Sequence, residues 1–263
     1  MIINKENILT YWKIILEASP KSEIFKYIFR RLLGKRKNFD QDVYITSNDL
    51  RFNCGRLMNN CTVACSQFES DLSPVFKDIS TAVDIGAHIG KHSLELSKTC
   101  NRVIAIEPDP ASFALLRENI VTNVASNILP LNCAMGSEPG NVTFYRDANY
   151  PTSNSITVKK NNNMEEITVV CDTLDNISKG LNVDIDFINV DVEGGELNVL
   201  KGGKETLKRC HPKIVFEAWN DNAAEEIKNY LLQFGYSFIR LDTYNYLAEV
   251  KKYDHDKNEK SNN

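Results

Sequence analysis

The chain has 263 residues, a net charge of −4, 42% hydrophobic residues and 25% charged residues. This composition supplies enough apolar side chains for a sizeable core, and it excludes an intrinsically disordered, collagen-like or coiled-coil protein. No apolar run approaches the roughly 18 residues that a membrane-spanning helix needs, and the net negative charge argues against nucleic acid as a partner.

The charge is concentrated at one end of the chain. Residues 1–40 contain nine Lys and Arg against four Asp and Glu, a charge of +5, which leaves −9 for the remainder. Apolar residues recur at helical spacing between residues 3 and 33, with a break at Ser19-Pro20. We therefore expect a basic helical extension over 1–40. It is either a cap with a solvated basic end or a weak contact to an anionic membrane surface or a polyanionic glycan.

The cysteines predict the compartment. There are seven of them, an odd number, and no Cys-x-x-Cys pair occurs. No signal-peptide pattern opens the sequence, because charged residues follow within the first six positions. We expect reduced thiols and a cytoplasmic protein.

Residues 41–80 form a lead-in or cap segment with an expected strand at 43–46 and an expected helix at 65–76. From residue 81 short apolar strands alternate with helices. The expected strands are 82–85, 103–106, 128–132, 142–145, 167–170, 185–190, 213–216, 238–241 and 246–250, and the expected helices are 88–97, 110–122, 196–209 and 222–234. Residues 147–164, rich in Asn, Ser and Thr, are expected to form a mobile loop, and 251–263 a disordered tail.

This alternation predicts the fold class. Strands that are apolar on both faces suit a parallel sheet covered by helices. We expect residues 81–250 to form one α/β domain. Its core would be a doubly wound, mostly parallel, seven-stranded Rossmann-like sheet with an antiparallel last hairpin.

The first functional motif follows the strand at 82–85. Asp84 lies at the end of this strand, and Gly86 and Gly90 lead into the next helix. The spacing Asp-x-Gly-x-x-x-Gly differs from the Gly-x-Gly-x-x-Gly of dinucleotide-binding dehydrogenases, which argues against an NAD-dependent oxidoreductase. Asp84 would repel a pyrophosphate but attract the ammonium group of an amino acid.

The second motif ends the following strand. A carboxylate at Glu107 can accept both hydroxyl groups of a ribose. Two acids at the ends of consecutive strands together predict S-adenosylmethionine as the cofactor. Asp84 and the loop of Gly86, His88 and Gly90 would bind its methionine part, and Glu107 its ribose.

Several stretches resemble the FkbM family of S-adenosylmethionine-dependent methyltransferases. They are residues 83–90, 105–109, 118–119, 173–175, 191–196 and 199–202. The family usually has Asn where His88 stands. The resemblance implies a class I methyltransferase fold and O-methylation of a hydroxyl group. The acceptor stays open: a sugar, a glycan, a lipid or a small metabolite. Residues 1–40 lie outside the resemblance.

The candidate catalytic residues follow the strand at 185–190. Asp191 would lie at the carboxyl edge of the sheet, where such folds bind ligands, and there it could take a proton from an acceptor hydroxyl. Glu193 is the second candidate base. Glu196 is expected to complement its helix dipole. Glu217 is expected to line the acceptor pocket.

Three alternatives remain open at this stage. Asp191 could merely shape the turn at Gly194-Gly195. The carboxylates of Asp191, Glu193 and Glu196, extended by His88 and Glu217, could hold Mg²⁺ or Ca²⁺, but we expect a site without a metal. The chain could also be a non-catalytic S-adenosylmethionine-binding protein, which the acids near the methyl group argue against. Trp219 and Tyr150 could face a sugar ring.

Overall fold

The computed structural model describes residues 12, 14–32, 38–65, 75–147, 151, 154–157, 162 and 164–250. The expected tail at 251–263 and most of the expected helix at 65–76 lie outside these residues. The described helix in that region is α3 (Met58–Ala64), which ends just before the expected one begins. In the part of the chain that the structure describes, no helix is long and apolar enough to cross a bilayer.

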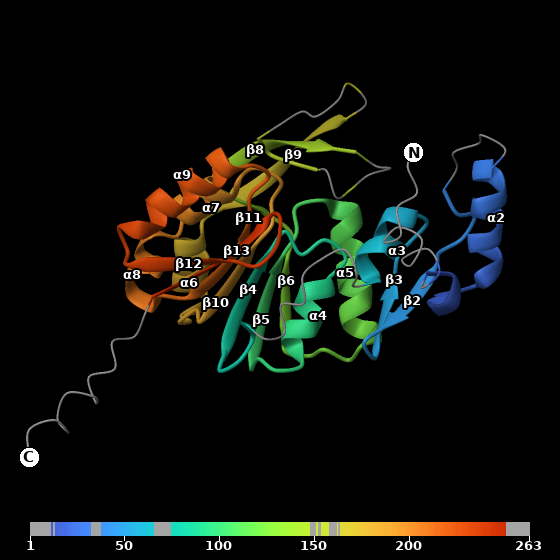
Figure 1. Cartoon of the computed structure of the whole chain (residues 1–263), viewed down its shortest axis with the longest axis horizontal. Coiled ribbons are helices and arrows are strands. Elements are labelled where there is room, and N and C mark those ends of the chain that lie inside the picture. The colour runs from blue at the N-terminus through green and yellow to red at the C-terminus, as the bar shows by residue number, and fades with distance from the viewer. Residues whose placement is uncertain are drawn as a thin grey trace, which may run out of the picture.

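The central element is a seven-stranded sheet with the order β12-β13-β11-β10-β4-β5-β6 (Figure 1). Its strands are β4 (Thr81–Ile85), β5 (Arg102–Ile106), β6 (Ile128–Leu131), β10 (Phe187–Val190), β11 (Lys213–Glu217), β12 (Tyr236–Arg240) and β13 (Asn245–Val250). Five neighbouring strands are parallel to one another, namely β4, β5, β6, β10 and β11. Strand β13 runs antiparallel to both β11 and β12. The predicted α/β fold is confirmed.

Helices cover both faces of this sheet because its strands are buried on both sides. The helices are α4 (Lys91–Ser97), α5 (Pro110–Thr122), α6 (Leu174–Leu181), α7 (Glu196–Lys201), α8 (Lys204–Cys210) and α9 (Asp221–Leu232). Ala82 and Val103 pack with α4 and α5, whereas Val83 and Ile104 pack with α6 to α9. This alternation follows the two-residue period of a strand.

The predicted helix at 196–209 is in fact two helices, α7 and α8. A Cβ on Gly202 would lie 2.0 Å from the carbonyl oxygen of Gly136, and one on Gly203 would lie 2.6 Å from Leu174. These contacts hold the two glycines against neighbouring segments at the point where the helix breaks. Asp175 accepts hydrogen bonds from the amides of Glu205 and Thr206, so its carboxylate caps the N-terminus of α8.

Two small sheets flank the central one. The first has the order β1-β2-β3 and comprises β1 (Ala18–Ser19), β2 (Tyr44–Ser47) and β3 (Leu50–Asn53). The expected strand at 43–46 corresponds to β2, whereas its hairpin partner β3 was not predicted. The missed signal is Asn48-Asp49, whose positive φ angles of 51° and 62° suit a two-residue hairpin turn.

The second small sheet has the order β7-β9-β8. It comprises β7 (Ala134–Met135), β8 (Gly140–Arg146) and β9 (Glu165–Asp172), and the last two form a long antiparallel hairpin. Arg146 forms an ion pair with Asp109 at 2.6 Å. Since Asp109 caps the N-terminus of α5, this pair ties the hairpin to the central domain.

Asn119 of α5 joins the first small sheet to the loop after β4. Its side chain is fully buried, accepts from the amide of Asn53 at 2.6 Å, and donates to the carbonyl oxygens of Asn53 at 3.2 Å and Ile89 at 2.9 Å. One turn along, Asn123 makes a similar pair with the backbone of Arg51 at an exposed position. The sheet β1-β2-β3 is therefore fastened to the edge of the loop that starts α4.

Asn119→Ala should lower the free energy of unfolding by about 2–3 kcal/mol, because it leaves buried backbone groups of Asn53 and Ile89 without their hydrogen-bond partner. Asn123→Ala is the matched control and should cost about 1 kcal/mol or less, because water can replace its exposed hydrogen bonds. Urea unfolding measures both. Equal losses for the two variants would contradict this role of Asn119.

Candidate functional site

The loop after β4 turns sharply through left-handed backbone conformations. Gly86, His88 and Gly90 have φ angles of +89°, +51° and +94°. A Cβ on Gly86 would lie 1.7 Å from the carbonyl oxygen of Asp191, and one on Gly90 would lie 2.6 Å from Leu116. The backbone contact and the φ angle thus require glycine at position 86, and the φ angle favours it at position 90. That this loop binds the methionine part of a cofactor stays a prediction.

Asp84 lies inside the domain, on the α4 face of the sheet, and is 1% exposed. Its carboxylate accepts hydrogen bonds from the hydroxyl of Ser93 and from Nδ2 of Asn189, the latter at 3.0 Å. Ser93 belongs to α4 and Asn189 to β10. Asp84 therefore ties three elements together directly beneath the loop that it precedes.

Glu107 follows β5 and points back towards the same loop. Its two oxygens accept from the backbone amides of His88 and Asp109, each at 2.8 Å. Burial raises the pKa of Glu107 to about 8, although both amides favour the ionised form. The structure thus brings together His88 and Glu107, which the sequence analysis had placed at the two halves of the cofactor.

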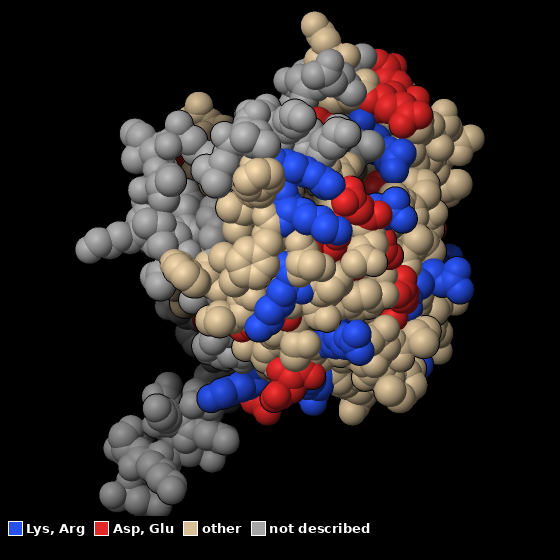
Figure 2. All heavy atoms as spheres, turned by 90° about the vertical axis from the view of Figure 1, so that its right-hand side faces the viewer, with Lys and Arg blue, Asp and Glu red and all other residues tan. Residues whose placement is uncertain are grey.

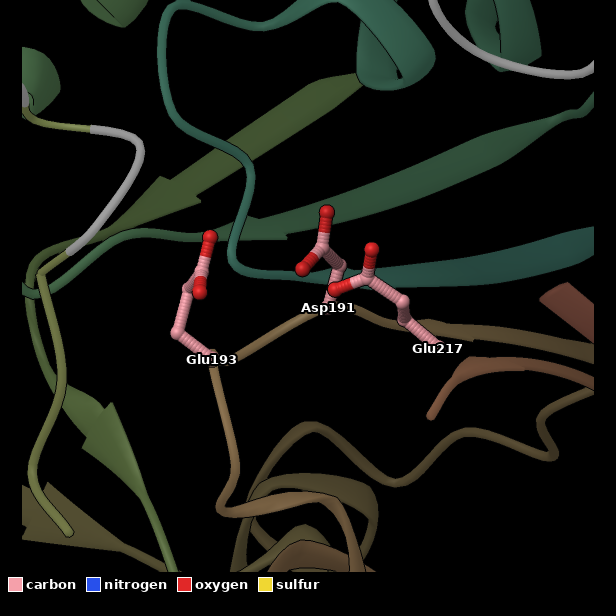
Figure 3. A group of neighbouring side chains, drawn as sticks. All are labelled: Asp191, Glu193 and Glu217. Atoms are coloured by element: carbon pink, nitrogen blue, oxygen red, sulfur yellow. The ribbon is translucent and has the colours of Figure 1, made fainter. Parts of the chain in front are cut away.

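Three carboxylates gather at the carboxyl edge of the neighbouring strands (Figure 3). Asp191 follows β10, Glu193 stands two residues later, and Glu217 ends β11. One oxygen from each lies within 4.8 Å of the other two, and all three side chains are half-buried. Figure 3 shows Asp191 and Glu217 close together, with Glu193 beside them on the loop that Asp191 begins.

The loop from Asp191 to Glu196 is held in a strained shape. Glu193 has a φ of +62°, which is unfavourable for a residue with a side chain. The carboxylate of Glu196 accepts from the amides of Gly194 at 2.9 Å and Val192 at 3.3 Å. Burial raises the pKa of Glu196. Glu196 therefore fixes the loop that carries Asp191 and Glu193, both of which are half-buried.

A short strip at residues 154–157 packs against this loop. Ser155 pairs with Tyr145 of β8 and donates its hydroxyl to the carbonyl oxygen of Glu193 at 2.9 Å. Asn154 and Ser155 are buried, although both belong to the expected mobile loop at 147–164. The sequence carries no signal for this contact, because composition does not tell which polar residues meet a distant loop.

Trp219 borders the three carboxylates. Its indole nitrogen donates to Glu217 at 3.1 Å, its ring lies about 4 Å from the position that a Cβ on Gly194 would take, and it is 40% exposed. The ring thus orients Glu217 and leaves an apolar surface beside the acids. The second aromatic candidate, Tyr150, lies outside the described residues.

Chemically, this edge of the sheet offers two complementary regions. The loop of residues 86–90 provides sharp backbone turns, and Glu107 provides a buried carboxylate of the kind that accepts ribose hydroxyl groups. Asp191, Glu193 and Glu217 offer proton acceptors, and their oxygens are also of the type that Mg²⁺ and Ca²⁺ prefer. Because the positions of Gly86 and Asp191 touch, the two regions form one site.

Comparison with known proteins gives a family and several relatives. The family model described as methyltransferase FkbM domain matches residues 84–238. Methyltransferase sdnD of Sordaria araneosa is 26% identical, over 60% of this chain and 74% of its own length. The hexuronic acid methyltransferase AglP of Haloferax volcanii is 31% identical, over 50% of this chain and 53% of its own length.

This chain thus spans about half the length of AglP. A crystal structure described as methyltransferase FkbM from Methylobacillus flagellatus is 24% identical, with a TM-score of 0.49, and the match covers 65% of this chain and 43% of that chain. The matched range 84–238 contains every site residue described above and excludes the first small sheet.

Glu107 should make the stability of the ligand-free protein depend on pH. Because burial raises its pKa from 4.5 to about 8, the folded protein keeps a proton that the unfolded chain releases above pH 4.5. Its contribution to the free energy of unfolding is present at low pH and is lost as the pH rises through about 8.

Urea unfolding at pH about 5.5 and about 8.5 tests this linkage. Over that interval Glu107→Gln should lose less stability than the wild type, by on the order of 2 kcal/mol. Glu205→Gln, at an exposed acid of α8, should follow the wild type. An identical pH dependence for Glu107→Gln and the wild type would show that Glu107 does not hold the proton.

Proposed function

Because residues 84–238 match its model, this chain belongs to the FkbM methyltransferase family, and we propose that it transfers a methyl group from S-adenosylmethionine to a hydroxyl oxygen of an acceptor. The observation that carries the proposal is the contact between Gly86 and the backbone of Asp191. It places the loop that would bind the cofactor directly beside the acids that could receive a proton.

The residues of the first loop fit this cofactor. Glu107 is fixed by two amides, and in its ionised form each oxygen keeps a further lone pair for a ribose hydroxyl. We propose that Asp84, Gly86, His88 and Gly90 bind the methionine half. Asp84 would act there mainly through its negative charge and through its hold on α4, because its carboxylate already accepts two hydrogen bonds.

When bound, S-adenosylmethionine supplies an electrophilic methyl group on a sulfonium. In our proposal Asp191 would accept the proton of the acceptor hydroxyl. The methyl group would pass from the sulfur to that oxygen, and S-adenosylhomocysteine would be the leaving group. The amide of Asp191 donates to Ile85 at 2.9 Å, which fixes the base against the end of β4. Glu193 is the second candidate base, and Glu217 would orient the acceptor.

The surroundings of Asp191 favour a neutral, hydroxyl-rich acceptor such as a sugar or a glycan. Trp219 offers a half-exposed aromatic face of the kind that packs against a sugar ring, and the carboxylates beside it can accept hydrogen bonds from hydroxyl groups. The relative AglP, named a hexuronic acid methyltransferase, supports a sugar acceptor. Three carboxylates would nevertheless repel an acidic group placed among them.

Asp191→Asn should lower the single-turnover rate of methyl transfer by roughly 10²–10⁴, because it keeps the shape of the side chain and removes the base. The affinity for S-adenosylmethionine should stay near that of the wild type. Methyl glycosides of neutral sugars and of uronic acids serve as trial acceptors, and the rate is measured at matched cofactor saturation.

Glu193→Gln is the matched control and should lose less activity than Asp191→Asn. A near wild-type rate for Asp191→Asn would transfer the role of base to Glu193. If the wild type bound S-adenosylmethionine but methylated none of the trial acceptors, the acceptor proposal would be wrong and a non-catalytic binding role would gain support.

A further inference from the structure

The helix α2 (Lys21–Leu32) presents aromatic side chains to solvent. Phe25 is 58% exposed and Phe29 is 64% exposed, and residues four apart lie side by side on a helix. The other side of the helix packs on the protein, because Ile24 is buried and Tyr27 and Ile28 pack against the core. The two phenylalanines are therefore directed mainly to solvent and are not part of the core cluster.

The preceding helical residues repeat this feature. Trp12 is 59% exposed and Leu16 is 67% exposed, again with a spacing of four residues. Isolated exposed apolar residues are normal on a protein surface. Two such pairs of exposed apolar residues within 18 residues are unusual, and they indicate a segment that binds another surface.

The charge of α2 is opposite to that of the whole chain. The helix contains Lys21, Lys26, Arg30 and Arg31 against Glu23, a charge of +3, whereas the chain carries −4. Lys26 pairs with Glu23 and Arg30 with Asp40, each at 2.7 Å. Figure 2 looks onto this end of the molecule, where Lys and Arg side chains lie interspersed with Asp and Glu.

We propose that the outward face of α2, defined by Lys21, Phe25, Lys26 and Phe29, docks on an anionic lipid surface. Phe25 and Phe29 would enter the boundary between headgroups and acyl chains, and the flanking lysines would meet lipid phosphates. A helix that carries exposed aromatic residues between cations is complementary to such a surface in both hydrophobicity and charge.

Two other partners fit this face less well. A second copy of the chain would oppose a helix of charge +3 to another of the same charge, which is repulsive. A specific protein partner normally covers about 20–30 residues on each side, whereas the apolar part of this face consists of two side chains. The proposal does not depend on the proposed methyl transfer, because α2 lies outside the matched range of 84–238.

Co-sedimentation of the full chain with vesicles tests the proposal. The wild type should bind vesicles of phosphatidylcholine with about one third phosphatidylserine, it should bind pure phosphatidylcholine much less, and added salt should weaken the binding. The double variant Phe25→Ser, Phe29→Ser should bind the anionic vesicles at least about tenfold more weakly. Its thermal unfolding should match that of the wild type, because the removed rings are exposed.

The matched control removes two exposed apolar residues at the opposite end of the protein. Leu232→Ser with Ile239→Ser, at positions that are 56% and 51% exposed, should keep wild-type binding to the anionic vesicles. The proposal is overturned if the wild type does not co-sediment with these vesicles, or if both double variants bind them equally. It is also overturned if concentration-dependent dimers form through Phe25 and Phe29 while vesicle binding is absent.

Discussion

The site depends on one backbone contact. The loop after β4 and the loop after β10 approach so closely that a Cβ on Gly86 would lie 1.7 Å from the carbonyl oxygen of Asp191. Any other residue at position 86 would push the two loops apart, and the left-handed φ of +89° adds a second requirement for glycine. The contact joins the loop proposed to bind the methionine half of the cofactor to the acids suited to proton transfer.

Around this contact, the acidic residues divide into two groups according to their burial. Asp84, Glu107 and Glu196 are buried, and each accepts two hydrogen bonds from loops or neighbouring elements. They fix the shape of the site. Asp191 and Glu193 are half-buried at the edge of the sheet, where a ligand can reach them. A sequence pattern alone does not separate these groups, because all of them lie at strand ends, in the loops that follow strands or at helix starts.

The sequence sufficed for features that depend on local patterns. The strand and helix periods predicted the seven-stranded sheet, and α5 has the predicted bounds of 110–122. The strand ends placed Asp191 and Glu217 at one edge, because the carboxyl ends of parallel strands coincide there. What the sequence could not supply were contacts between distant segments. The hydrogen bond from Ser155 to Glu193 and the contacts of Asn119 depend on tertiary packing, which no local pattern encodes.

The most direct test of the central claim is a calorimetric titration of the folded, full-length chain with S-adenosylmethionine, with NAD as the control ligand. The claim predicts one molecule of S-adenosylmethionine per chain, no binding of NAD, and an affinity at least about tenfold lower for Glu107→Ala. Absence of S-adenosylmethionine binding to the folded wild type, or binding of NAD in its place, would contradict it.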